Sequence, residues 1–446
     1  MRPEIKISVF GLGKLGCTML ACFAHKGWQV TGVDIYEPFV TKINNGESPI
    51  YEPGVDALIK ASRKNITATV HAQEAVQNSD VSFIIVPTPS EKSGSFNTRA
   101  VESVARSIAQ TLKTKNNYHL IVVTSTVLPG NTASIVQLLE NESGKKCNRD
   151  FGVCYNPDFI ALGSIVRDFL NPDMILIGES DKKAGDLLSS IHEHLVDSQP
   201  SIHRMTFENA ELTKISLNAY CTLKITYANV LAEICEKFPG GDVDVVTRAL
   251  GADTRIGNKY LKGGLSYGGP CFPRDNKAFA WTAQQLGVSQ MIALRTDEVN
   301  EYHRSERIPE KLSSILSEYN GNRIAVLGLT YKADTTLVEE SAALSVIRKL
   351  LEKNISVSVY DPAGMNEAKA ELGNSPHLNF TSAVTECLAG ADLCFIASPW
   401  KEFSKLTEQD FIGHMKHPVI FDAWNILQPA PGHRLDYRQI GKYHND

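Results

Sequence analysis

The sequence predicts an α/β protein with two doubly wound domains joined by a long central helix and a helical middle domain. Short β-branched runs alternate with amphipathic stretches in the N-terminal part, and the same alternation returns near residue 320. Between these parts a helical pattern runs without interruption from Thr206 to Lys237. Strands that alternate with helices form parallel sheets with helices on both faces. We therefore expect domains at residues 1–203, 204–305 and 306–446.

Ten runs rich in β-branched and aromatic residues are predicted as strands. The first domain contributes IKISVFGLG, WQVTGVDIY, VSFIIVPTP, HLIVVTST, GVCYNP and MILIGES. The last domain contributes RIAVLGLTY, ISVSVYDP, ADLCFIASP and PVIFDAW. Both domains are expected to be Rossmann-like, with parallel sheets.

The composition excludes several classes of function. With 45 basic and 50 acidic residues the net charge is −5, so the chain lacks the basic footprint of a nucleic-acid-binding protein. No run approaches the roughly 20 apolar residues of a membrane-spanning helix, and no secretion signal precedes the first strand pattern. Nine cysteines form no CxxC pair, so we expect neither a disulfide framework nor a metal site. These features are typical of a cytoplasmic protein.

A glycine-rich turn near the start of the chain predicts a dinucleotide site. The strand Ile5–Phe10 enters an apolar helix through the turn Gly11-Leu12-Gly13-Lys14-Leu15-Gly16. The glycines allow the backbone to approach a pyrophosphate closely, and the helix N-terminus supplies amide donors. Asp34 lies 18 residues beyond Gly16, where it can accept hydrogen bonds from ribose hydroxyls and would repel a 2′-phosphate. NAD is therefore the expected cofactor.

The last domain keeps only part of such a turn. Its first strand, RIAVLGLTYK, retains Gly328 alone and cannot cradle a pyrophosphate in the same way. This domain is expected either to bind the nucleotide of a substrate or to serve as a scaffold.

A second glycine-rich segment, Gly263–Gly269, leads to a cysteine between two prolines. In Gly268-Gly269-Pro270-Cys271-Phe272-Pro273-Arg274-Asp275 the thiol lies on a rigid loop instead of inside a strand or helix. A thiol on such a loop is open to substrate and can be activated by neighbouring charge. From this segment alone, a catalytic cysteine and an inert one both remain open.

Several motifs in order resemble the UDP-glucose/GDP-mannose dehydrogenase family, whose members carry a GGxCFPKD loop. The similarity extends over essentially the whole chain. The motifs are GLGKLG, VPTP at 86–89, STV at 125–127, NPDF at 156–159, AELTKISLN at 210–218, RIGNKYL at 255–261, the Cys271 loop, GLTYK at 328–332 and ASPWKEF at 397–403. The resemblance implies that a nucleotide sugar is oxidised twice at C6 by two NAD molecules, giving a uronate.

The resemblance also implies the catalytic residues. Cys271 is the nucleophile, which forms a thiohemiacetal with the intermediate aldehyde and then a thioester that is hydrolysed. Lys214 stabilises oxyanionic states at C6 with Asn218 beside it, and Asp275 handles protons. The same comparison gives Thr126 a catalytic water.

Without the resemblance, Lys214 and Asn218 have a simpler explanation. They lie one helical turn apart, with Glu211 a turn before, and such a pattern is usual for an exposed polar stripe with a Glu–Lys pair. Thr126 can equally be a cap at a strand end.

Ligand contacts follow from the same resemblance. Besides the glycine turn and Asp34, the expected NAD contacts are Pro87, Thr88, Ser125 and Thr126. Besides Lys214 and Asn218, the expected substrate contacts are Phe159, Ile160, Arg255, Tyr260, Leu261, Gly268 and Lys332. The cations among them suit a diphosphate. A homodimer is implied through the central helix, which is expected to expose Ile215, Tyr220 and Ile225.

The chain departs from the family pattern at five positions. Two family glutamates are replaced by Asp158, which keeps the charge on a shorter arm and can still activate water, and by Leu162. Three family arginines are replaced by Met174, Glu339 and Trp424. Because an indole offers stacking area instead of a guanidinium fork, we expect a nonstandard sugar, base or phosphate group.

Two other functions stay open at this point. The chain could perform only the first oxidation and release an aldehyde, because the hydrolytic positions 158 and 162 differ. It could also be a non-catalytic nucleotide sensor, although its nucleophile loop is intact. A simple hydroxyacid dehydrogenase would have no use for Cys271.

Overall fold

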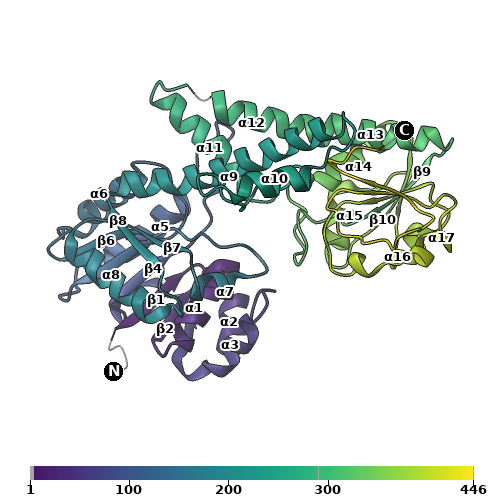
Figure 1. Cartoon of the computed structure of the whole chain (residues 1–446). Helices are drawn as coiled ribbons and strands as arrows, with labels where there is room; N and C mark the ends of the chain where they lie inside the picture. The colour runs from purple at the N-terminus through teal and green to yellow at the C-terminus, as the bar shows by residue number, and fades with distance from the viewer. Residues whose placement is uncertain (1–4, 290, 445–446) are drawn as a thin grey trace. The chain divides into compact units, whose positions relative to one another are not determined.

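The computed structural model describes residues 5–289 and 291–444 (Figure 1). The chain divides into two compact units, Met1–Ser216 and Leu217–Asp446. The three domains expected from the sequence are a finer division and remain a prediction.

Unit 1 is built on an eight-stranded sheet of order β3-β2-β1-β4-β5-β6-β7-β8. Its strands are β1 (Lys6–Phe10), β2 (Gln29–Val33), β3 (Ile66–Thr69), β4 (Val81–Ile84), β5 (His119–Val123), β6 (Phe151–Tyr155), β7 (Met174–Glu179) and β8 (Ser201–Met205). The helices are α1 (Lys14–His25), α2 (Glu37–Asn44), α3 (Val55–Ala61), α4 (Ala72–Gln77), α5 (Arg99–Leu112), α6 (Asn131–Ser143), α7 (Ile165–Leu170) and α8 (Lys182–Leu195). A short 3-10 helix, η1, spans Arg63–Asn65.

The core of unit 1 forms around β1 and α1. Ile7 and Val9 of β1 are fully buried, and every residue of α1 from Gly16 to Ala24 is buried. A helix that is apolar on all sides must be covered on all sides, and α1 is covered by the sheet, α3 and α7. This packing fixes the glycine turn between β1 and α1.

The prediction that the first sheet is parallel is wrong for two strands, β7 and β8, which run opposite to the other six. β7 pairs antiparallel with β6, through Cys154 with Glu179 and Tyr155 with Gly178, and β8 then pairs parallel with β7. The only helix between β6 and β7 is α7, whose six residues span about 9 Å. That is shorter than β6 itself, so α7 does not return the chain along the strand as a parallel crossover requires.

Helix α9 (Phe207–Cys235) has 29 residues and begins in unit 1 and ends in unit 2. The long helix expected at 206–237 is therefore confirmed. Its exposed side chains differ from expectation, because Ile215 is fully buried and Ile225 is half-buried, while Tyr220 is 57% exposed.

Unit 2 contains a six-stranded parallel sheet of order β11-β10-β9-β12-β13-β14. Its strands are β9 (Arg323–Leu327), β10 (Ser356–Tyr360), β11 (Leu378–Phe380), β12 (Leu393–Ile396), β13 (Val419–Asp422) and β14 (Asp436–Gln439). The helices are α10 (Val243–Ala252), α11 (Phe272–Gln285), α12 (Met291–Tyr302), the π-helix η2 (His303–Arg307), α13 (Ile308–Glu318), α14 (Ala342–Glu352), α15 (Met365–Leu372), α16 (Val384–Leu388), the 3-10 helix η3 (Phe403–Lys405) and α17 (Glu408–Ile412).

Both sheets contain the Rossmann order of strands, which confirms the predicted fold class. In unit 1 the order reverses between β1 and β4, and in unit 2 it reverses between β9 and β12. Ligands of such sheets bind beyond the carboxyl ends of the strands at this reversal. The ten predicted strands are present, and the structure adds β3, β8, β11 and β14.

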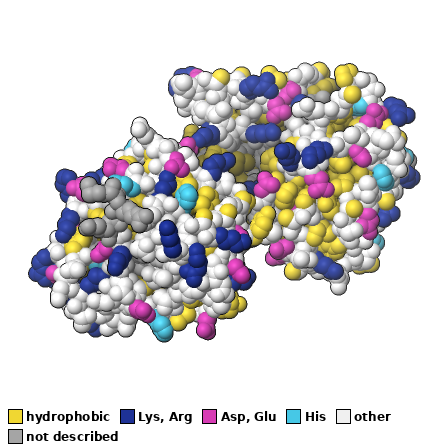
Figure 2. Space-filling view, turned by 90° about the horizontal axis from the view of Figure 1, so that it is seen from below, with side chains coloured by type: hydrophobic (Ala, Val, Ile, Leu, Met, Phe, Trp, Pro, Cys, Tyr) yellow, Lys and Arg dark blue, Asp and Glu magenta, His cyan; other side chains and the backbone are white. Residues whose placement is uncertain are grey.

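On the face seen in Figure 2, Lys and Arg side chains are interspersed with Asp and Glu side chains. Within residues 5–289 and 291–444, no helix combines the length and apolar character needed to cross a bilayer.

Candidate functional site

The glycine turn of unit 1 is shaped so that only glycine fits at two of its positions. Gly11 has φ +97°, and a Cβ there would lie 2.4 Å from the Ile85 carbonyl oxygen. A Cβ on Gly16 would lie 1.8 Å from the Gly11 carbonyl oxygen, so the helix could not pack against the turn. A Cβ on Gly13, by contrast, would meet nothing within 4 Å. The turn is therefore tightly packed at Gly11 and Gly16 and open to solvent at Gly13.

The open side of this turn fits a pyrophosphate. Gly13 is the N-cap of α1 and no side chain caps the helix there. The first backbone amides of the helix, those of Lys14 and Leu15, are therefore open to an anion. An anion at this place is stabilised by the N–H donors and by the helix dipole. This arrangement agrees with the predicted cofactor contacts.

Asp34 follows β2 and is tied to the same turn. Its Oδ2 accepts a hydrogen bond from the Leu12 N–H at 2.7 Å, and its Oδ1 accepts one from the Tyr36 N–H at 2.9 Å. The next residue, Ile35, is 99% exposed, which provides apolar surface beside the carboxylate. Sequence analysis did not single out Ile35, although an apolar residue directly after the acid was a usable signal.

The VPTP and STV segments meet at the carboxyl ends of β4 and β5. The Val86 N–H donates to Ser125 Oγ at 2.9 Å, and Ser125 Oγ donates back to the Val86 carbonyl at 2.8 Å. Thr88 Oγ1 donates to the Thr126 carbonyl at 2.8 Å. Pro87 lies exposed between these contacts. These expected cofactor contacts therefore form one rigid edge of unit 1.

Lys214 is buried in unit 1 against the NPDF segment. Its side chain is 9% exposed, and Nζ donates to the backbone carbonyl of Asp158. The same ammonium lies 4.6 Å from the centre of the Phe159 ring. Ile160 follows as a half-buried residue. The structure thus brings the expected lysine together with the expected substrate loop.

One oxygen of the Asp158 carboxyl is buried next to Lys214 without a hydrogen bond to the part of the chain that the structure describes. Its Oδ2 is fully buried and bonded to none of the described residues. Burial raises the pKa of Asp158 to about 7, although the positive charge of Lys214 opposes this shift. A carboxyl that titrates near neutral pH is suited to take up a proton from water.

Glu211 does not form the surface pair with Lys214 that its spacing suggested. It is fully buried, and its two carboxylate oxygens accept the Gly130 N–H and the Thr132 N–H, each at 2.7 Å. Burial raises the pKa of Glu211, against the effect of these hydrogen bonds. Glu211 therefore caps α6, directly after the STV segment, and sequence analysis missed this role.

Unit 2 holds the other part of the expected catalytic set. Asn218 Nδ2 donates to Asp275 Oδ2 at 2.6 Å, and Arg274 Nε contacts Asp275 Oδ1 at 3.0 Å. Asp275 is fully buried in the first turn of α11, where a negative charge is favoured by the helix dipole. Asn218 and Arg274 thus fix the orientation of this carboxylate.

Cys271 is the N-cap of α11 and its side chain is exposed. The turn before it requires glycine, because Gly269 has φ +79° and a Cβ on Gly268 would lie 2.1 Å from the Glu340 carbonyl oxygen. The Gly269 N–H donates to the Glu339 carbonyl at 3.0 Å. The glycines therefore present an accessible thiol at a helix N-terminus, where a thiolate is stabilised.

The substrate contacts expected in the RIGNKYL and GLTYK segments lie in different surroundings. Arg255 is exposed and its guanidinium binds the Asp253 carboxylate. Tyr260 has φ +62° and its ring meets Phe272 edge to face at 5.7 Å, while Leu261 is buried. Lys332 Nζ lies 5.8 Å from the centre of the Tyr331 ring.

Trp424 uses its only side-chain donor inside unit 2. Its Nε1–H donates to the Ala397 carbonyl at 2.9 Å, and its ring packs over Gly264, where a Cβ would lie 3.1 Å away. The indole therefore offers a surface for contact but no N–H for a phosphate.

Asp361 shows why the second Rossmann sheet does not repeat the first site. Gly328 has φ +98°, as Gly11 has in the first sheet, and Asp361 follows β10 as Asp34 follows β2. Here the carboxylate accepts six hydrogen bonds, from the Leu329, Thr330, Ala363 and Gly364 amides, the Thr330 hydroxyl and the Trp400 indole. None of its capacity remains for a ribose.

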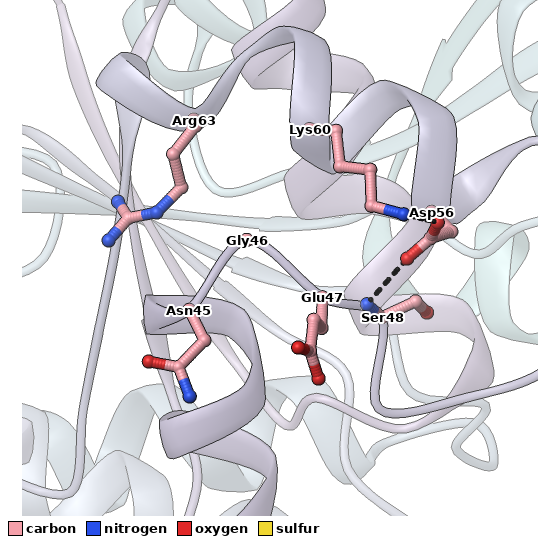
Figure 3. Close-up of a pocket in the computed structure, with 7 residues that line it drawn as sticks. All are labelled: Asn45, Gly46, Glu47, Ser48, Asp56, Lys60 and Arg63. Atoms are coloured by element: carbon pink, nitrogen blue, oxygen red, sulfur yellow. Dashed lines mark hydrogen bonds and ion pairs between the residues drawn. The ribbon is translucent and has the colours of Figure 1, made fainter.

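A surface cavity of about 550 Å³ in unit 1 is lined by the loop after α2, by α3 and by η1. Figure 3 shows that Lys60 reaches Asp56, which also accepts the Ser48 N–H, while Arg63 turns to the other side. Lys60 and Asp56 are paired with each other, and we assign no ligand to this cavity.

These features define a dinucleotide-dependent dehydrogenase with a cysteine available for covalent chemistry. The chain matches the UDP-glucose/GDP-mannose dehydrogenase family in its NAD binding domain (residues 5–196), its central domain (208–302) and its UDP binding domain (325–429). The chain belongs to this family and is an NAD-dependent nucleotide-sugar 6-dehydrogenase.

Individual relatives cover nearly the whole chain. The UDP-glucose 6-dehydrogenase AglM of Haloferax volcanii is 32% identical over 98% of this chain and 100% of its own length. The GDP-mannose 6-dehydrogenase of Pseudomonas aeruginosa is 32% identical over 95% of this chain and 100% of its own. The structure of a UDP-glucose dehydrogenase from Pyrobaculum islandicum is similar with a TM-score of 0.87, 31% identity, and coverage of 99% and 98% of the two chains.

Replacing Asp34 by alanine is expected to weaken NAD binding about 10- to 100-fold, because charge-assisted hydrogen bonds worth roughly 1.5–3 kcal/mol are lost. The preference for NAD over NADP should narrow as well. Fluorescence titration with NADH and NADPH measures both effects. The matched control is Asp56→Ala, which removes an exposed carboxylate of the same unit. Unchanged NADH binding by the Asp34 variant would contradict the assignment.

Proposed function

We propose that this enzyme oxidises a UDP-hexose of the glucose type to its uronate through a covalent intermediate on Cys271. The observation that carries the proposal is the exposed thiol at the N-terminus of α11, held by a turn that accepts only glycine. The Asn218–Asp275 hydrogen bond at the same helix end supports it. We expect the enzyme to act in the cytoplasm, in the synthesis of polysaccharide precursors.

The proposed reaction has four steps: oxidation, addition of the thiol, a second oxidation and hydrolysis. The C6 alcohol first loses a proton and a hydride and becomes an aldehyde. NAD, when bound, accepts the hydride of each oxidation. The Cys271 thiolate adds to the aldehyde carbon, and the resulting oxyanion takes up a proton to give a thiohemiacetal. Loss of a second hydride and this proton forms a thioester, and water then breaks the C–S bond, releasing the carboxylate and the thiol.

The basic and amide side chains of α9 serve the oxygen at C6. Lys214 supplies a positive charge and Asn218 an N–H donor for the oxyanion that develops there. Asp275 exchanges protons through water. The buried position of Lys214 supports its role, because an ammonium acts more strongly on a nearby charge where water is excluded.

Two residues of unit 1 act on water in the last step. Thr126, at the end of β5, holds the water, and Asp158 accepts a proton from it. The supporting observation is the buried Asp158 Oδ2, which has no hydrogen-bond partner within residues 5–289 and 291–444 and whose carboxyl has its pKa raised to about 7. An enzyme that performed only the first oxidation would need no such base.

The nucleotide end of the substrate is assigned to residues 306–446, the cofactor to residues 1–203 and the nucleophile to residues 204–305. The ranges that match the family's three domains lie inside these proposed boundaries. The occupied Asp361 supports the assignment, because the C-terminal Rossmann sheet has no acceptor left for a dinucleotide ribose. The side chain of Trp424 supports a substrate that is held by contact with the indole ring, at a position where the family pattern has an arginine.

Cys271→Ala is expected to lower uronate formation by on the order of 10³-fold or more, because residues of a covalent mechanism act as a unit. The wild type should give two NADH per UDP-glucose and favour it over GDP-mannose, measured by absorbance and by mass spectrometry of the product. Cys147→Ala, a half-buried thiol of unit 1, is the control. A Cys271 variant that still yields two NADH per sugar, or a wild type that prefers GDP-mannose, would reject the respective half of the proposal.

The thioester hydrolysis rate should rise as pH increases through about 7, because only the ionised Asp158 accepts a proton. Asp158→Asn is expected to abolish this rise and to slow hydrolysis. Because the folded-state pKa is raised from about 4 to about 7, the wild type loses stability as the pH rises from about 4 to about 7 and does not regain it at higher pH. The variant should therefore melt higher than the wild type at alkaline pH and alike near pH 4. Single-turnover kinetics and thermal melts across this range measure both. Retention of the pH dependence in the variant would exclude Asp158 as the base.

The enzyme is proposed to be a homodimer that pairs through α9. Tyr220, Tyr227 and Ile234 are spaced by seven residues and are 57%, 52% and 51% exposed, which leaves an apolar stripe along one helix face. Ile234→Asp is expected to shift the mass in solution from dimer to monomer, measured by light scattering. Leu286→Asp, at an exposed apolar site outside the stripe, is the control. A wild-type monomer, or an Ile234 variant that stays dimeric, would contradict this interface.

A further inference from the structure

The segment that leads to Cys271 is held by two asparagines from outside it. We call residues 263–270 the approach loop. Asn229 of α9 accepts the Gly264 N–H at 3.0 Å and donates to the Leu265 carbonyl at 3.4 Å. His303 Nε2 lies 3.1 Å from the Gly264 carbonyl oxygen. These contacts fix the beginning of the loop.

Asn300 of α12 fixes the middle of the approach loop through both ends of its amide. Its Oδ1 accepts the Tyr267 N–H at 2.9 Å, and its Nδ2 donates to the Tyr267 carbonyl at 3.1 Å. Its own carbonyl accepts the Ser266 hydroxyl at 2.8 Å. Asn300 is 5% exposed, so water does not replace these hydrogen bonds easily. One side chain therefore satisfies both backbone polar groups of Tyr267, much as a neighbouring strand would.

The Tyr267 side chain extends this anchor toward the nucleophile. Its hydroxyl donates to Asp297 of α12, one turn before Asn300. Its ring meets Phe272 edge to face at 6.4 Å, and Phe272 directly follows Cys271. α11 and α12 pack against each other (Figure 1). The position of the thiol thus depends on α12 through Tyr267 on one side and through the packing of α11 on the other.

We propose that Asn300 is a positioning residue that sets the Cys271 thiol for addition to the C6 aldehyde. This inference rests on the proposed role of Cys271 as the nucleophile. Asn300 touches neither substrate nor cofactor in this role. It acts through the Tyr267 peptide, from which only two glycines and a proline lead to the thiol.

The two oxidations separate this role from a general effect on folding. Forming the aldehyde needs no thiol, whereas forming the thioester does. Misplacing the reacting atoms by about an ångström can cost on the order of 100-fold. Loss of the Asn300 anchor should therefore slow the second oxidation selectively and leave the aldehyde unused.

Asn300→Ala is expected to lower uronate formation about 10- to 100-fold while the KM for the sugar changes less than about twofold. The NADH yield per sugar should fall from two toward one, with aldehyde trapped by hydroxylamine. Alkylation of Cys271 by iodoacetamide, followed by peptide mapping, should change in rate. The matched control is Thr296→Val on the same helix, since Thr296 is 4% exposed and its hydroxyl donates to the Ile292 carbonyl of α12 itself and not to the approach loop.

The outcomes distinguish the two proposals. Equal slowing of both oxidations by Asn300→Ala, or unchanged uronate formation and alkylation, would overturn the positioning role and leave the nucleophile untouched. An active Cys271→Ala variant would overturn the nucleophile, while the alkylation rate would still report whether Asn300 holds the loop. If Asn300→Ala does not fold, Asn300→Ser carries the same test with a smaller change in polarity.

Discussion

Helix α9 buries polar side chains on one face and exposes apolar side chains on the other, and the candidate site depends on the buried polar side chains. Buried polar side chains occupy one face at helical spacing, at Glu211, Lys214, Asn218, Thr222 and Asn229. The exposed apolar side chains Tyr220, Tyr227 and Ile234 lie on the opposite face. Burying polar groups costs free energy unless each finds a hydrogen bond, so this sequence is stable only because loops supply the partners. The exposed apolar face has no such compensation within one chain, which is the physical basis for the proposed dimer.

Most partners of these polar side chains are backbone groups of the segments that carry the candidate chemistry. Glu211 binds the amides after the STV segment, Lys214 binds the carbonyl of Asp158, and Asn229 binds the start of the approach loop. Irregular loops leave N–H and C=O groups unsatisfied, and a buried loop needs partners for them. Rigid helices meet this need at defined places, which Asn300 repeats from α12. Loops that would otherwise adjust to solvent are thereby fixed within each unit.

The sequence predicted those parts of the structure whose signal is local. The glycines of both turns were recognised from their pattern in the sequence. That pattern is informative because close contacts at positions such as Gly11 and Gly268 exclude other residues. The strands β3, β8, β11 and β14 were missed because ITAT, SIHRM, LNF and DYRQ contain no apolar run. Residues whose role depends on distant partners were also missed. Glu211 looked like a surface residue because the amides that bury it are 79 and 81 positions away, and Asn300 gave no signal because its partner is 33 positions away.

Two buried carboxyls show how the same side chain serves structure in one place and chemistry in another. Asp361 accepts six hydrogen bonds and stabilises the turn after β9, so its charge is fully used. Asp158 has a buried oxygen with no partner among the described residues, and its proton is retained to about pH 7. An unsatisfied buried acid is a cost that packing alone does not justify, because an asparagine or leucine would be better tolerated. The cost is understandable if the missing partner is a water molecule in the last step of the reaction. The shorter arm of aspartate then has a consequence, because the water must come closer to the backbone of the NPDF segment, where Lys214 already binds.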